Sequence, residues 1–336
     1  MVNNYRVANK NIWQGRVDNS KDFASFRWHQ VICNINLSNL GETKIDINKK
    51  NYCLLGYECN EGVIRNLGRT GTEKAPDYLR KEMANLAWNN NSNVELYDAG
   101  NIFCLNNNLE TAQQALSEAV EKILSLGMFP IIMGGGHDIA FGNYNGVAGF
   151  VYKRQKEKRI GIINFDAHFD LRPYKNMKGS SGTMFLQIAD MCKKNNNAFS
   201  YHCVGIQTYA NTKRLFQTAK ELNVNFELAK NINESNLADI KSNLNKFISQ
   251  NDHIYLTICS DVFSSAYAPG VSSPQPFGLL PEISLELIKY VAASNKLVSF
   301  DIAEISPRFD EDNRTAKLGA IIIYALINTL SGNHLG

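Results

Sequence analysis

Short apolar runs rich in β-branched residues recur along the chain, and longer stretches with polar and apolar residues in helical spacing separate them. Apolar runs of this length, bounded by turn residues, are typical of strands buried within a sheet. The pattern therefore predicts strands at residues 53–57, 129–133, 160–165, 204–206, 254–258 and 297–300.

Helical spacing is clearest between Ala112 and Leu124, where apolar residues recur three or four positions apart. Gly127 follows in the position of a helix stop, and similar patterns occur at 285–293 and 318–330. Strands that alternate with helices favour a mostly parallel sheet covered on both faces. We therefore predict an α/β fold, a three-layer α/β/α sandwich with a mostly parallel central sheet.

Composition and charge narrow the domain organisation and the classes of partner. Hydrophobic residues make up 44% and charged residues 20% of the 336 residues, and the net charge is +3; dispersed basic residues argue against a nucleic-acid partner. Without an internal repeat or a long linker, one domain over 1–336 is predicted. The start lacks a signal-peptide core and no apolar run reaches a membrane-spanning length. Seven cysteines without a CxxC pair favour the cytoplasm.

Residues that bind metals or carry protons follow three of the predicted strands. The segments 134–138 (GGGHD), 166–170 (DAHFD) and 259–261 (CSD) each come directly after a predicted strand. In parallel sheets, ligands gather beyond the carboxyl ends of the strands. We expect these three segments to lie together.

The segment 166–170 is the strongest of these signals. Asp166, His168 and Asp170 are spaced two apart, so an extended backbone would point all three side chains to one side. An oxygen-rich ligand set with few imidazoles favours Mn²⁺ over Zn²⁺. The alternative is a polar turn with a buried, hydrogen-bonded histidine. The glycines before His137 would also suit a phosphate, but no phosphate-loop spacing follows them.

These motifs, in their order and spacing, resemble the signatures of the arginase, agmatinase and formimidoylglutamase superfamily. The resemblance rests on Gly135-Gly136-His137, on 166–170, on the segment around Asp261 and on 301–307 (DIAEISP). Similarity to the formimidoylglutamase branch extends over nearly the whole chain, through 13–16, 68–69, 75–80, 171–172, 180–183, 268–272 and 314–316.

The resemblance implies a pair of Mn²⁺ ions, bridged by Asp166. A second bridging carboxylate belongs at the position where this chain has Cys259. A thiolate there could still ligate and would shift the preference toward zinc or iron. A neutral thiol would weaken the second site and leave one ion, and a buried inert cysteine is the third alternative. The metal ligands implied by the family are His137, Asp166, His168, Asp170, Cys259 and Asp261.

The implied reaction is hydrolysis of N-formimidoyl-L-glutamate to L-glutamate and formamide, a step of histidine degradation, by attack of metal-bound hydroxide on the formimidoyl carbon. Asp170 would pass the proton to the departing nitrogen, and Glu304 would accept hydrogen bonds from the nitrogen end of the substrate. Arg172, Ser181 and Thr183 match positions that bind the amino-acid part, where a guanidinium suits a carboxylate. Resemblance also implies a homo-oligomer.

Two alternatives stay open. The first is a ureohydrolase that acts on a guanidino compound such as agmatine; Arg172 opposes it, because a cationic tail would not be paired with arginine. The second is a chain that keeps the fold but has lost its chemistry through Cys259 and serves as a binding or regulatory subunit.

Arginases carry a histidine where this chain has 183–186 (TMFL). The other histidines lack ligand spacing and are expected to be structural or surface residues: His29, His202, His253 and His334.

Overall fold

A single sheet runs through the part of the chain that the computed structural model describes, residues 3–41, 44–176 and 178–333. His334 and the ends of the predicted domain lie outside the described residues. The strands are β1 (Tyr5–Arg6), β2 (Cys33–Asn34), β3 (Lys50–Glu58), β4 (Val94–Phe103), β5 (Phe129–Met133), β6 (Ile160–Phe165), β7 (Ser200–Ile206), β8 (Asn225–Leu228), β9 (His253–Cys259) and β10 (Leu297–Ala303).

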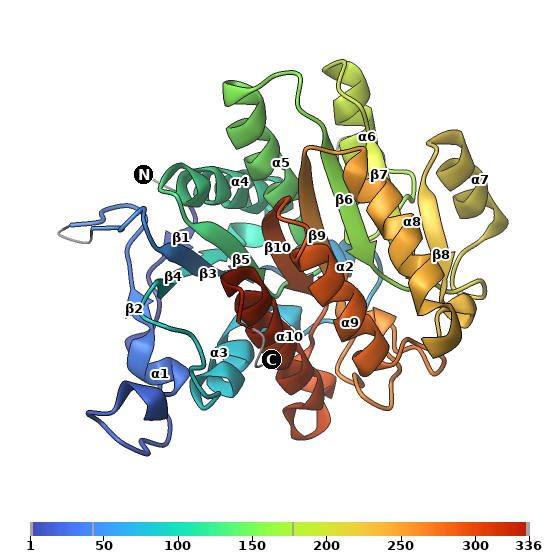
Figure 1. Cartoon of the computed structure of the whole chain (residues 1–336). Helices are drawn as coiled ribbons and strands as arrows, with labels where there is room; N and C mark the ends of the chain where they lie inside the picture. The colour runs from blue at the N-terminus through green and yellow to red at the C-terminus, as the bar shows by residue number, and fades with distance from the viewer. Residues whose placement is uncertain (1–2, 42–43, 177, 334–336) are drawn as a thin grey trace.

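The strand order is β1-β4-β3-β5-β10-β9-β6-β7-β8, and β2 pairs with β4 (Figure 1). All pairings are parallel except that of β1 with β4. Each predicted strand overlaps an observed one, and the mostly parallel sheet is confirmed.

Helices cover both faces of the sheet (Figure 1). Helices α3 (Ala75–Ala84), α8 (Leu237–Ser249), α9 (Pro281–Ala292) and α10 (Arg314–Ser331) contribute to one apolar core. Helices α4 (Leu109–Ser125), α5 (Ile139–Arg154), α6 (Met184–Lys194) and α7 (Lys213–Glu221) contribute to the other. The short helices are α1 (Trp28–Val31) and α2 (Glu61–Arg65). The predicted three-layer sandwich is confirmed.

Local chemistry explains both a confirmed boundary and a missed strand. Helix α4 stops as predicted: Gly127 has a left-handed φ of +75°, and the Met128 amide donates to the Ile123 carbonyl at 3.2 Å. Strand β4 was missed because buried Asp98 interrupts its apolar pattern. The buried guanidinium of Arg80 pairs with this carboxylate at 2.8 Å. Because Arg80 lies outside the strand, the residues of β4 alone give no sign that Asp98 can be buried.

The central strands bring the polar segments to one edge of the sheet. Strands β5, β10, β9 and β6 are neighbours, with Ala303 opposite Cys259 and Phe165 opposite Ile258. Their carboxyl ends therefore meet, and the expectation that 134–138, 166–170 and 259–261 lie together is confirmed.

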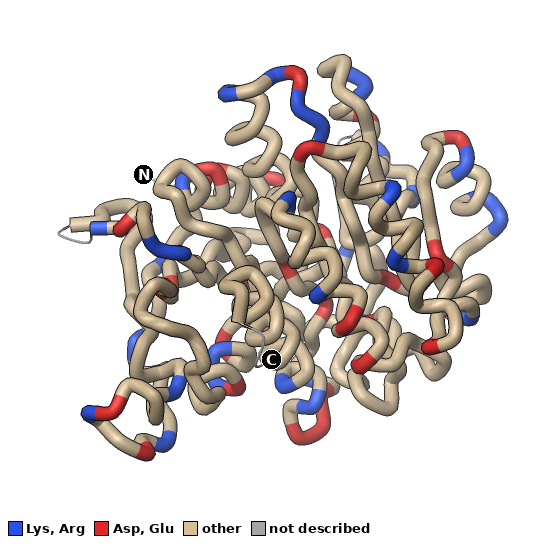
Figure 2. The backbone as a smooth tube through the Cα atoms, in the orientation of Figure 1, with Lys and Arg blue, Asp and Glu red and all other residues tan. Residues whose placement is uncertain are grey.

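Charged residues are spread over the described part of the molecule. Figure 2 shows Lys and Arg interspersed with Asp and Glu along the backbone. Among the described residues, no helix is long and apolar enough to cross a membrane.

Candidate metal centre and its pocket

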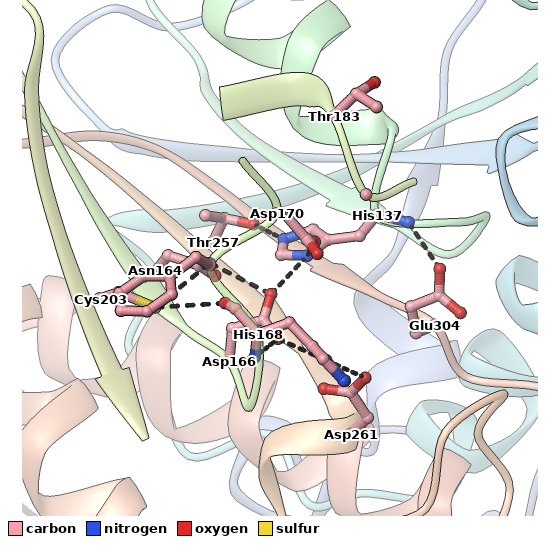
Figure 3. A network of polar contacts seen from close by, with 12 residues as sticks. His137, Asn164, Asp166, His168, Asp170, Thr183, Cys203, Thr257, Asp261 and Glu304 are labelled. Carbon is pink, nitrogen blue, oxygen red and sulfur yellow. Dashed lines mark hydrogen bonds and ion pairs between the residues drawn. The ribbon is translucent and has the colours of Figure 1, made fainter. Parts of the chain in front are cut away.

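A glycine turn places His137 at the carboxyl edge of the sheet. Gly134 and Gly135 have φ values of +84° and +75°, which disfavour residues with a Cβ. A Cβ on Gly135 would lie 2.5 Å from Tyr57 Cδ1 and 2.8 Å from the Tyr57 carbonyl oxygen. The backbone therefore passes directly over the end of β3, and buried His137 points toward the end of β6 (Figure 3).

The segment 166–170 is not extended, which corrects the reason we gave for its converging side chains. The backbone bends at residues 167 and 168, and Asp170 has a left-handed φ of +49°. The bend is closed by a bond from the His168 amide to Asp166 Oδ1 at 2.8 Å. The side chains converge because the chain folds back on itself, so strand alternation is not the cause.

Two groups of three ligand atoms share Asp166. His137, Asp166 and Cys259 offer atoms that lie within 4.8 Å of one another, and so do Asp166, His168 and Asp261. Asp170 joins the first group, with Oδ2 3.1 Å from His137 Nδ1. The structure thus brings together all the residues predicted as metal ligands.

The electrostatics of this cluster suit cations. Burial raises the pKa of Asp170 to about 6, and the neighbouring Asp166 carboxylate adds to the rise. Burial also acts to raise the pKa of Asp166, but its bonds to His137 and His168 outweigh this and hold it below the usual range. Asp261 Oδ1 is buried and has no hydrogen-bond partner among the described residues. Buried carboxylates this close together are stabilised by a shared cation, so the residues fit a metal.

Cys259 lies inside the cluster, only 2% exposed. Burial raises the pKa of its thiol well above the ordinary value, and the carboxylates of Asp166 and Asp261 raise it further. In the metal-free protein the thiol is therefore neutral, whereas a bound cation would favour the thiolate. Its place within a ligand group favours a ligand role over a remote inert cysteine.

Glu304 faces the same cluster from the end of β10. It is 6% exposed, so it is a buried acid and not a solvated one. Its Oε1 accepts a bond from the His137 amide at 2.9 Å, and its own amide donates to the Gly135 carbonyl at 2.9 Å. Burial raises the pKa of Glu304 to about 8. The carboxyl group is fixed to the glycine turn.

A cavity of about 290 Å³ opens above these residues. We call its inner residues the floor: His137, His168, Asp170, Cys259, Asp261 and Glu304. We call the loop residues around its mouth the rim: Asn66, Leu67, Gly68, Arg69, Arg172, Ser181, Ser272 and Ser273.

Two guanidinium groups belong to the rim. Neither Arg69 nor Arg172 forms an ion pair with an acid in the part of the chain that the structure describes. Arg69 stacks on the Phe309 ring at 4.1 Å, and its Nε donates to the Ser272 carbonyl at 3.0 Å. These contacts hold Arg69 beside the pocket. No role was predicted for Arg69 from the sequence, where only a Gly-Arg pair marks it.

Ser181 lines the pocket as predicted for a binding residue, but Thr183 does not. The Thr183 hydroxyl accepts from the Ser180 amide at 2.8 Å and bonds to Gln187 Oε1 at 3.0 Å. Thr183 is buried behind the 180–182 loop, directly before α6. Its placement supports a role in holding that loop, and it corrects our expectation of direct contact with a ligand.

Comparison with known proteins agrees with this geometry. The Arginase family model matches residues 50–328. A formimidoylglutamase of Clostridium tetani (strain Massachusetts / E88) is 50% identical over 328 residues, which cover 98% of this chain and 97% of the relative. In structure, the chain is similar to a formimidoylglutamase from Bacillus subtilis subsp. subtilis str. 168, with a TM-score of 0.79, 22% identity and coverage of 97% and 98%.

A Trypanosoma cruzi formiminoglutamase with Mn²⁺ has the same fold, with a TM-score of 0.75, 22% identity and coverage of 89% of this chain and 99% of that one. Family model, full-length relatives and fold agree with the shared motifs at the carboxyl edge of the sheet. The chain belongs to the arginase family and, within it, to the formimidoylglutamases.

Proposed function

We propose that this protein is a manganese-dependent hydrolase that converts N-formimidoyl-L-glutamate and water to L-glutamate and formamide. One observation carries the proposal: two ligand groups that share Asp166 lie beneath a rim with two guanidinium groups that have no acidic partner among the described residues. The floor suits hydrolysis, and the rim suits a substrate with two carboxylates.

The chain offers places for two cations. His137, Asp166, Asp170 and Cys259 would hold one, and Asp166, His168 and Asp261 the other. Manganese suits the carboxylate-rich set, and the Trypanosoma cruzi relative carries it. Such ions supply the Lewis acidity that makes water a nucleophile at neutral pH.

Two floor carboxyl groups have separate tasks in this proposal. Asp170, beside His137 on the floor, takes a proton from the attacking water and gives it to the departing glutamate nitrogen. Glu304 is fixed by the His137 amide and accepts hydrogen bonds from the nitrogen end of the formimidoyl group. Proton transfer and orientation are thus divided between two strand ends.

The rim recognises the glutamate part. Arg172 and Ser181 bind one carboxylate, and Arg69 lies where it can bind the other. A guanidinium holds a carboxylate with two parallel bonds. The same charges disfavour agmatine, because its cationic tail would be repelled.

Some expectations stay predictions. They are the single domain over 1–336, the occupancy by two ions, a cytoplasmic location, homo-oligomeric assembly and the lack of a nucleic-acid partner. Size-exclusion chromatography with light scattering would measure the assembly directly.

The test uses purified, reduced protein with Mn²⁺ and N-formimidoyl-L-glutamate, with agmatine as the competing substrate. Release of formamide and glutamate is assayed, and bound metal is counted in the same sample. We expect turnover of the formimidoyl compound alone. Absence of turnover with Mn²⁺, Zn²⁺ and Fe²⁺, with activity appearing in Cys259→Asp, would replace the proposal with the hypothesis of a degenerate site.

A further inference from the structure

A chain of hydrogen bonds runs from the back of His137 into the centre of the sheet. His137 Nε2 lies 2.9 Å from Thr257 Oγ1, and Thr257 Oγ1 lies 2.5 Å from Asp301 Oδ1 (Figure 3 shows the first contact). Thr257 and Asp301 are register partners on β9 and β10. Both are fully buried, so solvent does not compete for these bonds.

Asp301 is an unusual residue for this position. Its other oxygen, Oδ2, accepts bonds from Asn143 Nδ2 at 2.7 Å and from the Tyr255 hydroxyl. Among the described residues, no Lys, Arg or His forms an ion pair with it. A buried carboxylate without a paired cation costs several kcal/mol. Stability alone does not account for an acid here.

The number of available hydrogens fixes the direction of the chain. A threonine hydroxyl has one hydrogen, and the Asp301 carboxylate accepts it. The hydroxyl can then only accept from His137, so Nε2 of the imidazole carries a hydrogen. Nδ1 faces Asp166 Oδ2 at 2.9 Å and Asp170 Oδ2 at 3.1 Å, and without a metal it donates a hydrogen to these carboxylates. A bound cation would take the place of that hydrogen, so Nδ1 is the nitrogen free to bind the metal.

We propose that Thr257 and Asp301 are positioning residues that fix the tautomer and orientation of His137, so that Nδ1 binds the metal. Loss of a residue that hydrogen-bonds to a metal ligand typically weakens metal affinity about 10–100-fold. The inference rests on the proposed function only in assuming that the site holds a metal. It adds two residues, neither at the pocket surface, to the machinery of the site.

The first test measures the Mn²⁺ dissociation constant of metal-free protein by titration calorimetry, without substrate. Thr257→Val keeps the shape of the side chain and removes the hydroxyl, so we expect Mn²⁺ to bind about 10–100-fold more weakly. Thr257→Ser keeps the hydroxyl and should restore most of the affinity. Asp301→Asn, which replaces an acceptor oxygen by a donor, should weaken binding in the same range.

Ser299→Ala is the matched control. Ser299 Oγ donates to Asn143 Oδ1 at 2.7 Å and is as buried as Thr257, but it lies three hydrogen bonds further from His137. Its Mn²⁺ affinity should equal that of the wild type. Thermal melting of each metal-free variant separates loss of the fold from loss of affinity. Equal affinity in wild type and Thr257→Val, or equal losses in Ser299→Ala and Thr257→Val, would overturn the inference.

A second measurement reads the tautomer directly. In protein loaded with diamagnetic Zn²⁺, the ¹⁵N shifts of His137 should show a protonated Nε2 and an unprotonated Nδ1. The reverse assignment would refute the inference whatever the affinities. Wild-type protein that binds Mn²⁺ but does not hydrolyse N-formimidoyl-L-glutamate would refute the proposed substrate and leave this inference intact.

Discussion

The floor and the rim of the pocket differ in how the fold builds them. Floor residues stand at the ends of β5, β6, β9 and β10, where neighbouring strands fix their relative positions. Rim residues lie in loops after α2, after the 166–170 segment and after β9, which reach the pocket from separate parts of the chain. The sheet therefore holds the candidate chemistry, and loop packing holds the candidate specificity.

Burial makes the two regions differ in energy as well. Floor carboxylates lie in a low-dielectric environment, where each charge interacts strongly with its neighbours. Arg172 on the rim is exposed, so water and salt weaken its interactions. Substitutions in the floor should therefore act on metal binding and have the larger effects, whereas substitutions in the rim should act on substrate affinity.

The largest effect is expected for Asp166→Ala, because Asp166 belongs to both ligand groups. Manganese affinity should fall by more than about 100-fold, beyond the loss typical of a residue that hydrogen-bonds to a metal ligand, and turnover should be lost with it. Calorimetry with Mn²⁺ measures the first and formamide release the second. Asp252→Ala is the control, because Asp252 pairs with Lys158 away from the pocket. Tight manganese binding by Asp166→Ala would show that Asp166 is not a carboxylate shared by the two metal positions.

Substitution of the rim arginines should act through the substrate. Arg69→Met and Arg172→Met should each lower kcat/KM by roughly 10–100-fold, the value of a charged hydrogen-bonded contact, with Mn²⁺ affinity unchanged. Arg214→Met is the control, because Arg214 is exposed and pairs with Glu221 outside the pocket.

Truncated substrates sharpen this prediction. N-formimidoyl-L-norvaline lacks the γ-carboxylate, and 4-(formimidoylamino)butyrate lacks the α-carboxylate. Each analogue should be insensitive to one of the two arginine substitutions and sensitive to the other. Equal losses with all three substrates would mean that the arginines support the loops and do not bind carboxylates.

A smaller effect is expected at Cys259. Cys259→Asp should shift the ratio of Mn²⁺ to Zn²⁺ affinity toward manganese by roughly tenfold, because a carboxylate is a harder ligand than a thiolate. Competition between the two metals in calorimetry measures the ratio. Cys192→Ala serves as the control, because Cys192 is a buried cysteine that forms a hydrogen bond with the Tyr144 hydroxyl outside the pocket. An unchanged ratio would identify Cys259 as an inert thiol.

The smallest expected effect at neutral pH is on stability alone, at a buried histidine outside the candidate site. His202 on β7 packs against Phe247, and burial lowers its pKa from 6.5 to about 4. Between pH 6.5 and pH 4, His202 therefore binds a proton in the unfolded state but not in the folded state. His202 costs no stability above pH 6.5, and the loss grows as pH falls and is complete near pH 4, at on the order of 3 kcal/mol.

Urea unfolding of wild type and His202→Gln between pH 7 and 4, on metal-free protein, measures this effect. The difference in unfolding free energy should move in favour of the glutamine variant as pH falls. A difference that stays constant with pH would show that His202 is protonated in the folded state. The expected result would separate His202, a merely buried histidine, from His137, whose bonds to Asp166 and Asp170 raise its pKa despite burial.

Much of the fold and the floor could be predicted because the signals are local. An apolar strand followed at once by Asp166, His168 and Asp170 places three side chains at a strand end whatever the rest of the chain does. The detailed backbone could not be predicted in the same way. The left-handed φ of Asp170 leaves no mark in the spacing of the motif. The residues were chosen correctly, but the extended backbone assumed for them was wrong.

The sequence by itself determined the layered α/β architecture, the order of the motifs and the identity of the floor residues, because hydrophobic periodicity and strand-end residues are properties of short segments. Only the tertiary structure decided that Arg69 joins the rim, that Thr183 stands behind it, and that Thr257 and Asp301 support His137. Each of these depends on contacts between strands and loops at least 44 positions apart or on the path of one loop. Spacing along the chain carries no record of such contacts, because they form only when the sheet is assembled.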